Sequence, residues 1–418
     1  MSSRRFHTAY NVSANNWLLR RYACVEERFF TMLSGWIWTT PGLEHKIELA
    51  RLAYEDALHT DALQGRAGEL YPPTEAPPRP AATEMLTALG NEIANAETLA
   101  ERLVGVFRVL KPDLLAAYRQ HLAETDEITD GPTAAILKRL IVEEEEHLAW
   151  GNQVLENLEA DAKIARQAAA WENHLHNLVR ATGTVRQPGA QPGLSPAFRN
   201  PAPPRVDLQR FPARDGRFQI VPVDEYQVHS MGETPNDILR HLLYANTYGE
   251  MEAEDMLGEV IMNAPEFPWP MRLDLARQMW DEARHAELSW RRMEELGGAP
   301  QPLPPIPPVI LGTVGEATDP LERLIILQRA IEGRVAERHR YRAIHIARDL
   351  GDAQTARLFE YIVADERAHI GYSEWIEQQI GADPERLKQL EQRQLEAEQR
   401  LEDILSRRID TTAGKRTA

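Results

Sequence analysis

One pairing of residue types recurs along the sequence, a Glu followed three positions later by a His. It occurs at Glu144 and His147, at Glu282 and His285, and at Glu366 and His369, with the variant Asp56 and His59. Residues three apart lie on the same face of an α-helix, so such a carboxylate and imidazole can reach one metal ion in a helical core. A single pair is more often an exposed salt bridge. Two pairs on the second and fourth helices of one bundle are the arrangement that a dinuclear carboxylate site requires.

The elements that must position these pairs are helices. Outside the proline clusters, apolar residues recur at spacings of three and four, and alternating strand-like runs are almost absent, which predicts an all-α protein. In the second half we expect helices at about 237–262, 271–296, 320–350 and 352–380. The pairs at Glu282 and Glu366 then fall on the second and fourth of these helices.

A dinuclear site also needs one acid from each of the other two helices. Glu250 lies in the apolar stripe of the first helix, between Leu243 and Leu257, where an unpaired carboxylate would cost several kcal/mol. A pair of metal ions removes that cost. Glu332 follows Ile331 in the third helix and lies nearly as far before the turn expected at Gly351 as the fourth-helix pair lies after it.

Antiparallel neighbours at equal distances from their connecting loop sit at the same height, so these distances predict the level of each acid. Glu250 passes the same test about the loop between the first and second helices. Glu254 and Glu337 come within about a turn and remain substitutes.

The two halves of the chain resemble each other. Placing residues 49–63 on 275–288 puts His59 on His285 and Asp56 on Glu282, and a proline cluster follows each of these helices, at 71–80 and 297–312. An extended proline-rich chain rises about 3.1 Å per residue, so such a segment can run the length of a bundle between its second and third helices. The expected domains are a degenerate bundle at 1–180, a Pro-rich linker at 181–235, a di-metal bundle at 236–382, and a C-terminal amphipathic helix and tail at 383–418.

The pattern in the second half resembles the ligand set of the ferritin-like di-iron carboxylate superfamily, and the match covers roughly 237–380. The stretches GEMEAEDML and WDEARHAELSWRRMEELG also look like uncharacterised bacterial ferritin-like proteins. The resemblance implies a tandem of ferritin-like four-helix bundles, each with a long crossover between its second and third helices. It implies oxygen or peroxide chemistry at two irons. The metal ligands expected in this sequence are Glu250, Glu282, His285, Glu332, Glu366 and His369.

The residue types favour iron. Carboxylate-rich sites with one imidazole per metal suit Fe, Mn or a mixed Fe/Mn pair, whereas structural zinc prefers cysteine or more histidine. Four Glu residues balance two divalent ions, so two Fe ions give a nearly neutral centre. Each ligand His should be oriented by a further acceptor, and Asp281 and Asp365 are adjacent candidates.

The first half lacks one ligand of the same set. Glu26, Asp56, His59, Glu144 and His147 have counterparts in the second half, but the acid required from the third helix projects to Arg108. An arginine there can replace the charge of a metal by pairing with Glu144. We therefore expect a metal-free first bundle, and a second di-metal site that uses Glu97 or Glu101 is the alternative.

Composition narrows the remaining functions. A formal net charge of -17 would repel nucleic acid and anionic membrane surfaces. A single cysteine, no signal-peptide core and no long apolar run predict a cytoplasmic protein without a membrane span. The amphipathic C-terminal segment would pack on the body or on a partner subunit, as in a homodimer.

The leading functional hypothesis is a di-iron oxidase or oxygenase that uses O2 on a small organic substrate, with an electron donor protein as a further partner. A ferroxidase or a peroxide-detoxifying protein is one alternative. A non-catalytic scaffold whose helices are held together by metal is another. The substrate cannot be read from the sequence, because the walls of a bundle pocket are ordinary apolar side chains.

Overall fold

The computed structural model describes residues 9–70, 84–186, 196–225, 234–315, 317–380 and 383–406. Within these ranges the side chains of 224, 333–339, 370, 373–380 and 404–406 are not described. The described chain is mostly helical, and its only strands are a two-residue parallel pair, β1 (Gln219–Ile220) and β2 (Pro305–Ile306). No described helix combines the length and apolar character needed to cross a membrane.

The chain divides into two compact units. Unit 1 contains residues 1–33 and 52–205, and unit 2 contains residues 34–51 and 206–418. The end of α1 and the beginning of α2 therefore belong to unit 2, and the rest of both helices belongs to unit 1. The first proline cluster, at 71–80, lies outside the described residues, so the crossover expected there stays a prediction, as do the domain bounds.

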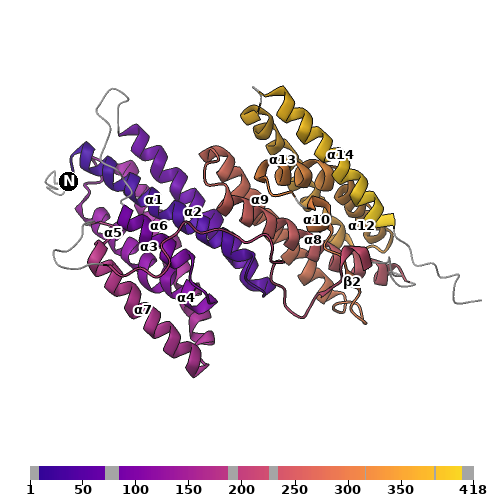
Figure 1. Cartoon of the computed structure of the whole chain (residues 1–418), viewed down its shortest axis with the longest axis horizontal. Helices are drawn as coiled ribbons and strands as arrows, with labels where there is room; N and C mark the ends of the chain where they lie inside the picture. Colours follow the sequence, from indigo (N-terminus) through magenta and orange to yellow (C-terminus); the bar gives the residue numbers. More distant parts are fainter. Residues whose placement is uncertain are drawn as a thin grey trace, which may run out of the picture. The chain divides into compact units, whose positions relative to one another are not determined.

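Unit 1 contains seven α-helices and one π-helical segment among its described residues (Figure 1). They are α1 (Val12–Ile37), α2 (Leu43–Glu69), α3 (Glu84–Ala94), α4 (Leu99–Leu103), the π-helical η1 (Val104–Leu110), α5 (Lys111–Glu124), α6 (Gly131–Leu158) and α7 (Ala162–Thr182). The segments α4, η1 and α5 follow one another without a break and act as one long helix. This helix packs along α6, and η1 also contacts α7.

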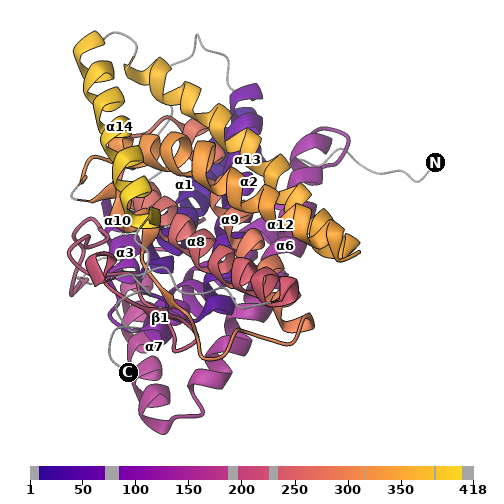
Figure 2. The same ribbon diagram turned by 90° about the vertical axis from the view of Figure 1, so that its right-hand side faces the viewer.

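Unit 2 contains the helices predicted for the second half. In chain order its elements are β1, η2 (Val223–Glu225), α8 (Pro235–Asn263), α9 (Trp269–Glu295), β2, α10 (Val309–Val314), α11 (Pro320–Ile325), the π-helical η3 (Ile326–Ala336), α12 (Glu337–Asp349), α13 (Ala353–Ile380) and α14 (Pro384–Ser406). The expected third helix is the continuous run of α11, η3 and α12. Helix α8 packs along α9 and α12 along α13, and α9 also contacts α13 (Figure 2).

Local signals explain where these helices begin and end. Thr234 caps α8 by accepting a hydrogen bond at its side chain from the backbone N–H of Asp237, and Pro235 follows in the first turn. At the other end of the unit, Gly351 has a φ of 71°, a left-handed conformation that glycine adopts without steric cost. Asp352 then accepts the N–H of Thr355 and starts α13. The turn expected at Gly351 is confirmed.

Two glycines of α8 provide a matched pair for a test of packing. A Cβ added at Gly258 would lie 2.3 Å from the backbone oxygen of Ser34 in α1, whereas a Cβ at Gly249 would meet nothing within 4 Å. We expect Gly258→Ala to lower the free energy of unfolding by about 1–3 kcal/mol through overpacking. Gly249→Ala should raise it by about 0.5–1 kcal/mol because alanine favours the helix. Urea denaturation measures both, and equal effects would contradict the close approach.

Candidate metal centre

The structure brings the six predicted ligands of the second half together inside unit 2. We call them the unit 2 cluster: Glu250 from α8, Glu282 and His285 from α9, Glu332 from η3, and Glu366 and His369 from α13. Each is at most 4% exposed. Charged side chains are seldom fully buried without a partner, so six in one place require compensation.

The unit 2 cluster consists of two overlapping groups. One contains Glu250, Glu282, His285 and Glu366, and the other contains Glu282, Glu332, Glu366 and His369. In each group one ligand atom per residue lies within 4.8 Å of all the others. Glu282 and Glu366 belong to both groups. Two carboxylates shared between two four-residue groups are the arrangement in which two cations are bridged.

Both imidazoles turn the same nitrogen toward the carboxylates. Nδ1 of His369 lies 3.1 Å from Glu282 and 3.1 Å from Glu366, and Nδ1 of His285 lies 3.4 Å from Glu282 and 3.5 Å from Glu366. The side-chain oxygens Oε2 of Glu282 and Oε2 of Glu332, and Nδ1 of His285, are buried and have no hydrogen-bond partner. Lone pairs that face one another without a donor between them are suited to a cation.

The outer nitrogen of each imidazole faces an acid from another helix. Nε2 of His285 lies 3.2 Å from Asp365, and Nε2 of His369 lies 3.4 Å from Asp281. Arg284 contacts both acids and so links α9 to α13. An Nε2–H that donates to a carboxylate leaves the Nδ1 lone pair directed inward, which is the tautomer a metal ligand needs. These are the two acids that the sequence suggested for this role.

Two further side chains contact the cluster and were missed by the sequence reasoning. Arg340 of α12 donates to Oε1 of Glu250 at 3.0 Å and lies 2.6 Å from Oε1 of Glu366. Gln278 of α9 donates to Glu332 at 3.0 Å. Arg340 follows Glu332 by two helical turns, so its position on the inner face was the available signal.

The environment separates the pKa values of these groups. Burial raises the pKa of Glu250 to about 8, although the charge of Arg340 opposes the rise. Burial, together with the charges of Glu366 and Glu282, raises the pKa of Glu332 well above its ordinary value. Burial acts in the same direction on Glu282, but the two imidazoles outweigh it and hold its pKa well below the usual range. Of these three carboxylates, Glu282 is therefore the one most strongly held as an anion, as suits a residue shared by both groups.

The alternatives to these ligands can be placed only in part. Glu254 is fully buried, but it does not belong to either group, and its two side-chain oxygens have no hydrogen-bond partner. Burial raises its pKa to about 8. The side chain of Glu337 lies outside the described residues, so its substitution for Glu332 stays untested.

The corresponding residues of unit 1 also lie together. The prediction that Arg108 of its third helix pairs with Glu144 was wrong. Arg108 pairs with Glu159, at 2.6 and 2.8 Å, instead of with Glu144. Lys111 takes the expected role: its Nζ lies 2.7 Å from Glu144 and 2.8 Å from Asp56. Arg108 lies inside the π-helical η1, and Lys111 is the first residue after it, so the wider turns of η1 place the two side chains on different faces.

The alternative ligands for a second di-metal site in unit 1 do not lie with Glu26, Asp56, His59 and Glu144. Glu97 is exposed. Glu101 belongs to the capping box of α4, where its side chain accepts a hydrogen bond from the backbone N–H of Thr98. The alternative prediction, a second di-metal site that uses either residue, is therefore wrong.

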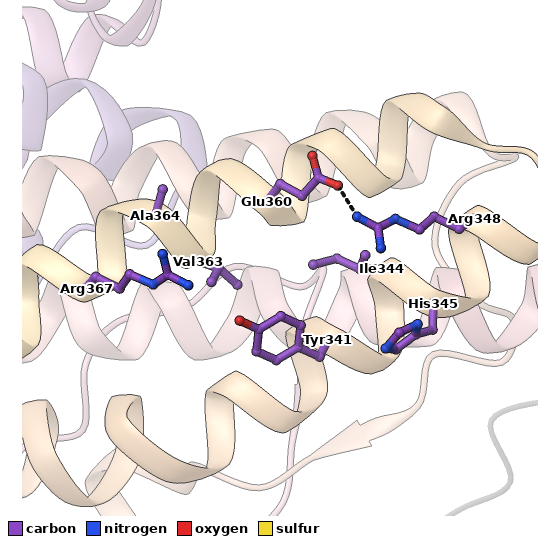
Figure 3. A pocket seen from close by; sticks show the side chains of 8 residues that line it. All are labelled: Tyr341, Ile344, His345, Arg348, Glu360, Val363, Ala364 and Arg367. Atoms are coloured by element: carbon purple, nitrogen blue, oxygen red, sulfur yellow. Dashed lines mark hydrogen bonds and ion pairs between the residues drawn. The ribbon is translucent and has the colours of Figure 1, made fainter.

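A hollow of about 300 Å³ lies on the outer faces of α12 and α13 (Figure 3). Tyr341, His345 and Arg367 line it, and Arg348 and Glu360 form an ion pair of 2.6 Å at one end. None of the six cluster residues lines this hollow. It is a surface feature of the helix pair and is separate from the buried centre.

Part of the chain is similar to a known family. Residues 189–389 match the family described as "Protein of unknown function (DUF455)". All six residues of the unit 2 cluster lie within this stretch. No curated protein and no solved structure matches the chain. The family description names no activity, so any function must be argued from the cluster itself.

The acids behind the imidazoles provide a test of the cluster's design. Asp365→Ala removes the acceptor of His285 Nε2 and is expected to weaken metal binding about 10–100-fold, because it frees the ring to turn. Competition with a chromophoric chelator measures the affinity. Glu360→Ala, on the same helix and paired with Arg348 at the surface, is the control and should leave affinity unchanged. Equal affinities in the two variants would contradict an orienting role for Asp365.

Proposed function

We propose that unit 2 is a ferritin-like four-helix bundle that binds two iron ions and acts as an oxidase or oxygenase on a small organic substrate, with O2 as oxidant. The overlap of the two groups through Glu282 and Glu366 carries this proposal. Two ions held by these residues, with Glu282 and Glu366 available to both, would explain why six ionisable side chains are buried together. The tandem arrangement, with unit 1 as a related bundle, belongs to the same proposal.

The donor set fits two irons. Four carboxylates supply four negative charges, of which Arg340 offsets one, and two divalent ions would bring the centre to within one charge of neutral. Each ion would receive one imidazole, His285 in one group and His369 in the other. Oxygen donors with a single nitrogen suit iron or manganese better than structural zinc. Bound iron would supply the redox chemistry that activates O2.

The chain's own residues hold this donor set in place. Arg340 fixes Glu250 and Glu366 from the α12 side, and Gln278 fixes Glu332 from the α9 side. Asp281 and Asp365 orient the imidazoles from outside. The surrounding apolar core, which includes Leu243 and Met251, keeps bulk water away from the charged groups and so strengthens their interactions.

The second candidate function is a scaffold in which the centre only stabilises the helices. Arg340 favours it, because a buried guanidinium already offsets part of the negative charge and ties α12 to α8 and α13. A scaffold needs no reaction with oxygen. The two functions therefore differ in one measurable property.

The test is anaerobic loading of the full chain with Fe²⁺, followed by a pulse of O2. An enzyme predicts rapid oxygen uptake with oxidation of the bound iron, and Glu282→Ala, which lacks a shared ligand, should lose that uptake. If oxygen uptake by the unaltered chain were no faster than by Glu282→Ala, the enzyme function would be excluded and the scaffold function would remain. Oxidation that continues over many equivalents of added Fe²⁺ without a substrate would instead indicate a ferroxidase.

Glu332 separates the two groups of the cluster. Glu332→Ala removes a ligand of the group that contains His369 and leaves the group that contains His285 intact, so we expect the chain to lose one ion. Elemental mass spectrometry of the loaded and desalted protein measures the content. Full content in Glu332→Ala, with a loss in Glu337→Ala, would assign the ligand to Glu337.

A further inference from the structure

In unit 1, the side-chain nitrogen of Lys111 lies among the counterparts of the group of the unit 2 cluster that contains His369. Its Nζ is fully buried and lies 2.8 Å from Asp56, 2.7 Å from Glu144 and 3.1 Å from Nδ1 of His147. These three residues are the counterparts of Glu282, Glu366 and His369. The third helix of unit 1 thus supplies an ammonium group where the third helix of unit 2 supplies Glu332.

Unit 1 has a counterpart for every residue of the group of the unit 2 cluster that contains His285. Glu26, Asp56, His59 and Glu144 are all 0% exposed, and one ligand atom from each lies within 4.8 Å of the others. Three carboxylate oxygens of this group, one each from Glu26, Asp56 and Glu144, are buried without a hydrogen-bond partner. Lys111 binds the other oxygen of Asp56 and of Glu144, so its ammonium does not satisfy them.

The hydrogen-bond partners of His59 and Glu26 direct one ring nitrogen and one carboxylate oxygen toward the centre of this group. Nδ1 of His59 lies 3.2 Å from Glu26 and 3.5 Å from Glu144, and its Nε2 lies 2.8 Å from Glu143 in α6. This repeats the orientation of His285 against Asp365. Tyr118 donates to Oε1 of Glu26 at 2.6 Å, which leaves Oε2 as the free donor atom.

We propose that unit 1 binds a single divalent transition-metal ion between Glu26, Asp56, His59 and Glu144, with the ammonium of Lys111 in place of a second ion. Three carboxylates and one ammonium leave two negative charges when the imidazoles are neutral, and one divalent ion cancels them. One ion also gives a partner to all three unsatisfied oxygens, which two imidazole protons could not do. The site is distinct from the centre of unit 2 and does not depend on its reaction.

The experiment counts Mn²⁺ in the full chain, because an isolated Mn²⁺ ion and an exchange-coupled pair give different electron paramagnetic resonance spectra. Glu26→Gln keeps the acceptor for Tyr118 and removes the free carboxylate oxygen. We expect this variant to lose one Mn²⁺ per chain and the signal of the isolated ion. Glu97→Gln, an exposed site in the same unit, is the control and should lose neither.

A second arm removes the contribution of unit 2. In the double variant Glu282→Ala with Glu366→Ala, one Mn²⁺ should remain, with the spectrum of an isolated ion, and adding Glu26→Gln should remove it. The double variant is compared with the unaltered chain by circular dichroism to verify its helix content. An unchanged count in Glu26→Gln in the otherwise unaltered chain would overturn the proposal, whatever unit 2 binds.

Discussion

Glu282→Ala is expected to lower the metal content of the chain by two ions. Glu282 belongs to both groups of the unit 2 cluster, and its pKa is held well below the ordinary range by the neighbouring imidazoles. Its removal therefore takes an anionic ligand from each ion at once. Elemental mass spectrometry after loading and desalting gives the content relative to the unaltered chain, and this difference does not depend on what unit 1 binds.

Glu254→Gln is the matched control for this prediction. Glu254 is as deeply buried as Glu282, on α8, but it stands outside both groups. Burial raises its pKa to about 8, so its carboxyl is mostly neutral at pH 7 and an amide of the same size replaces it closely. The control should keep its metal. Loss of two ions from Glu254→Gln, with full content in Glu282→Ala, would show that Glu254 of α8, and not Glu282 of α9, is the ligand shared by both ions.

The sequence was sufficient for the unit 2 cluster because two simple regularities apply there. A spacing of three places Glu366 and His369 on one helix face, and equal distances from the turn at Gly351 place Glu332 at their height. The third helix is π-helical around Glu332, and the projection from Gly351 passed only the last residues of that segment before it reached Glu332. The resulting error stayed within one turn.

The same projection was three residues too long in unit 1: run back from the loop after α5, it passed Lys111, the first residue of α5, and ended at Arg108, inside η1. The backbone N–H of Lys111 donates to the carbonyl of Val106, five residues earlier, so the helix is wider there than the 3.6-residue period assumes. The residue that faces the cluster is consequently Lys111 instead of Arg108. Pro112 was a sequence signal of this irregularity, since proline lacks the donor that a regular helix requires in its interior.

Among the contacts from outside the ligand set, those of Asp281 and Asp365 were expected from the sequence, and those of Arg340 and Tyr118 were missed. Arg340 donates a hydrogen bond to Glu250 in unit 2, and Tyr118 donates one to the corresponding residue of unit 1, Glu26. A long or aromatic polar side chain reaches the core from positions that periodicity assigns to the edge of the inner face. Their roles became apparent only from the distances.

Lys111→Met is expected to destabilise unit 1 by about 3–5 kcal/mol, the usual consequence of removing one partner from a buried ion pair. Burial alone would lower the pKa of Lys111, but the charges of Asp56 and Glu144 outweigh it and keep the amine protonated. Methionine fills nearly the same space, so the loss reports the charge. Urea denaturation followed by circular dichroism, with chelator present so that added metal cannot compensate, measures the free energy of unfolding.

Lys138→Met separates a buried charge from an exposed one within the same unit. Lys138 pairs with Glu127 at 2.8 Å, but both side chains are more than half exposed. Water and salt screen such a pair, so its loss should cost at most about 1 kcal/mol. If Lys111→Met cost no more than this, Asp56 and Glu144 would have to be neutral in the folded chain. The ammonium could then not stand in for a metal ion, and the charge balance proposed for unit 1 would fail with it.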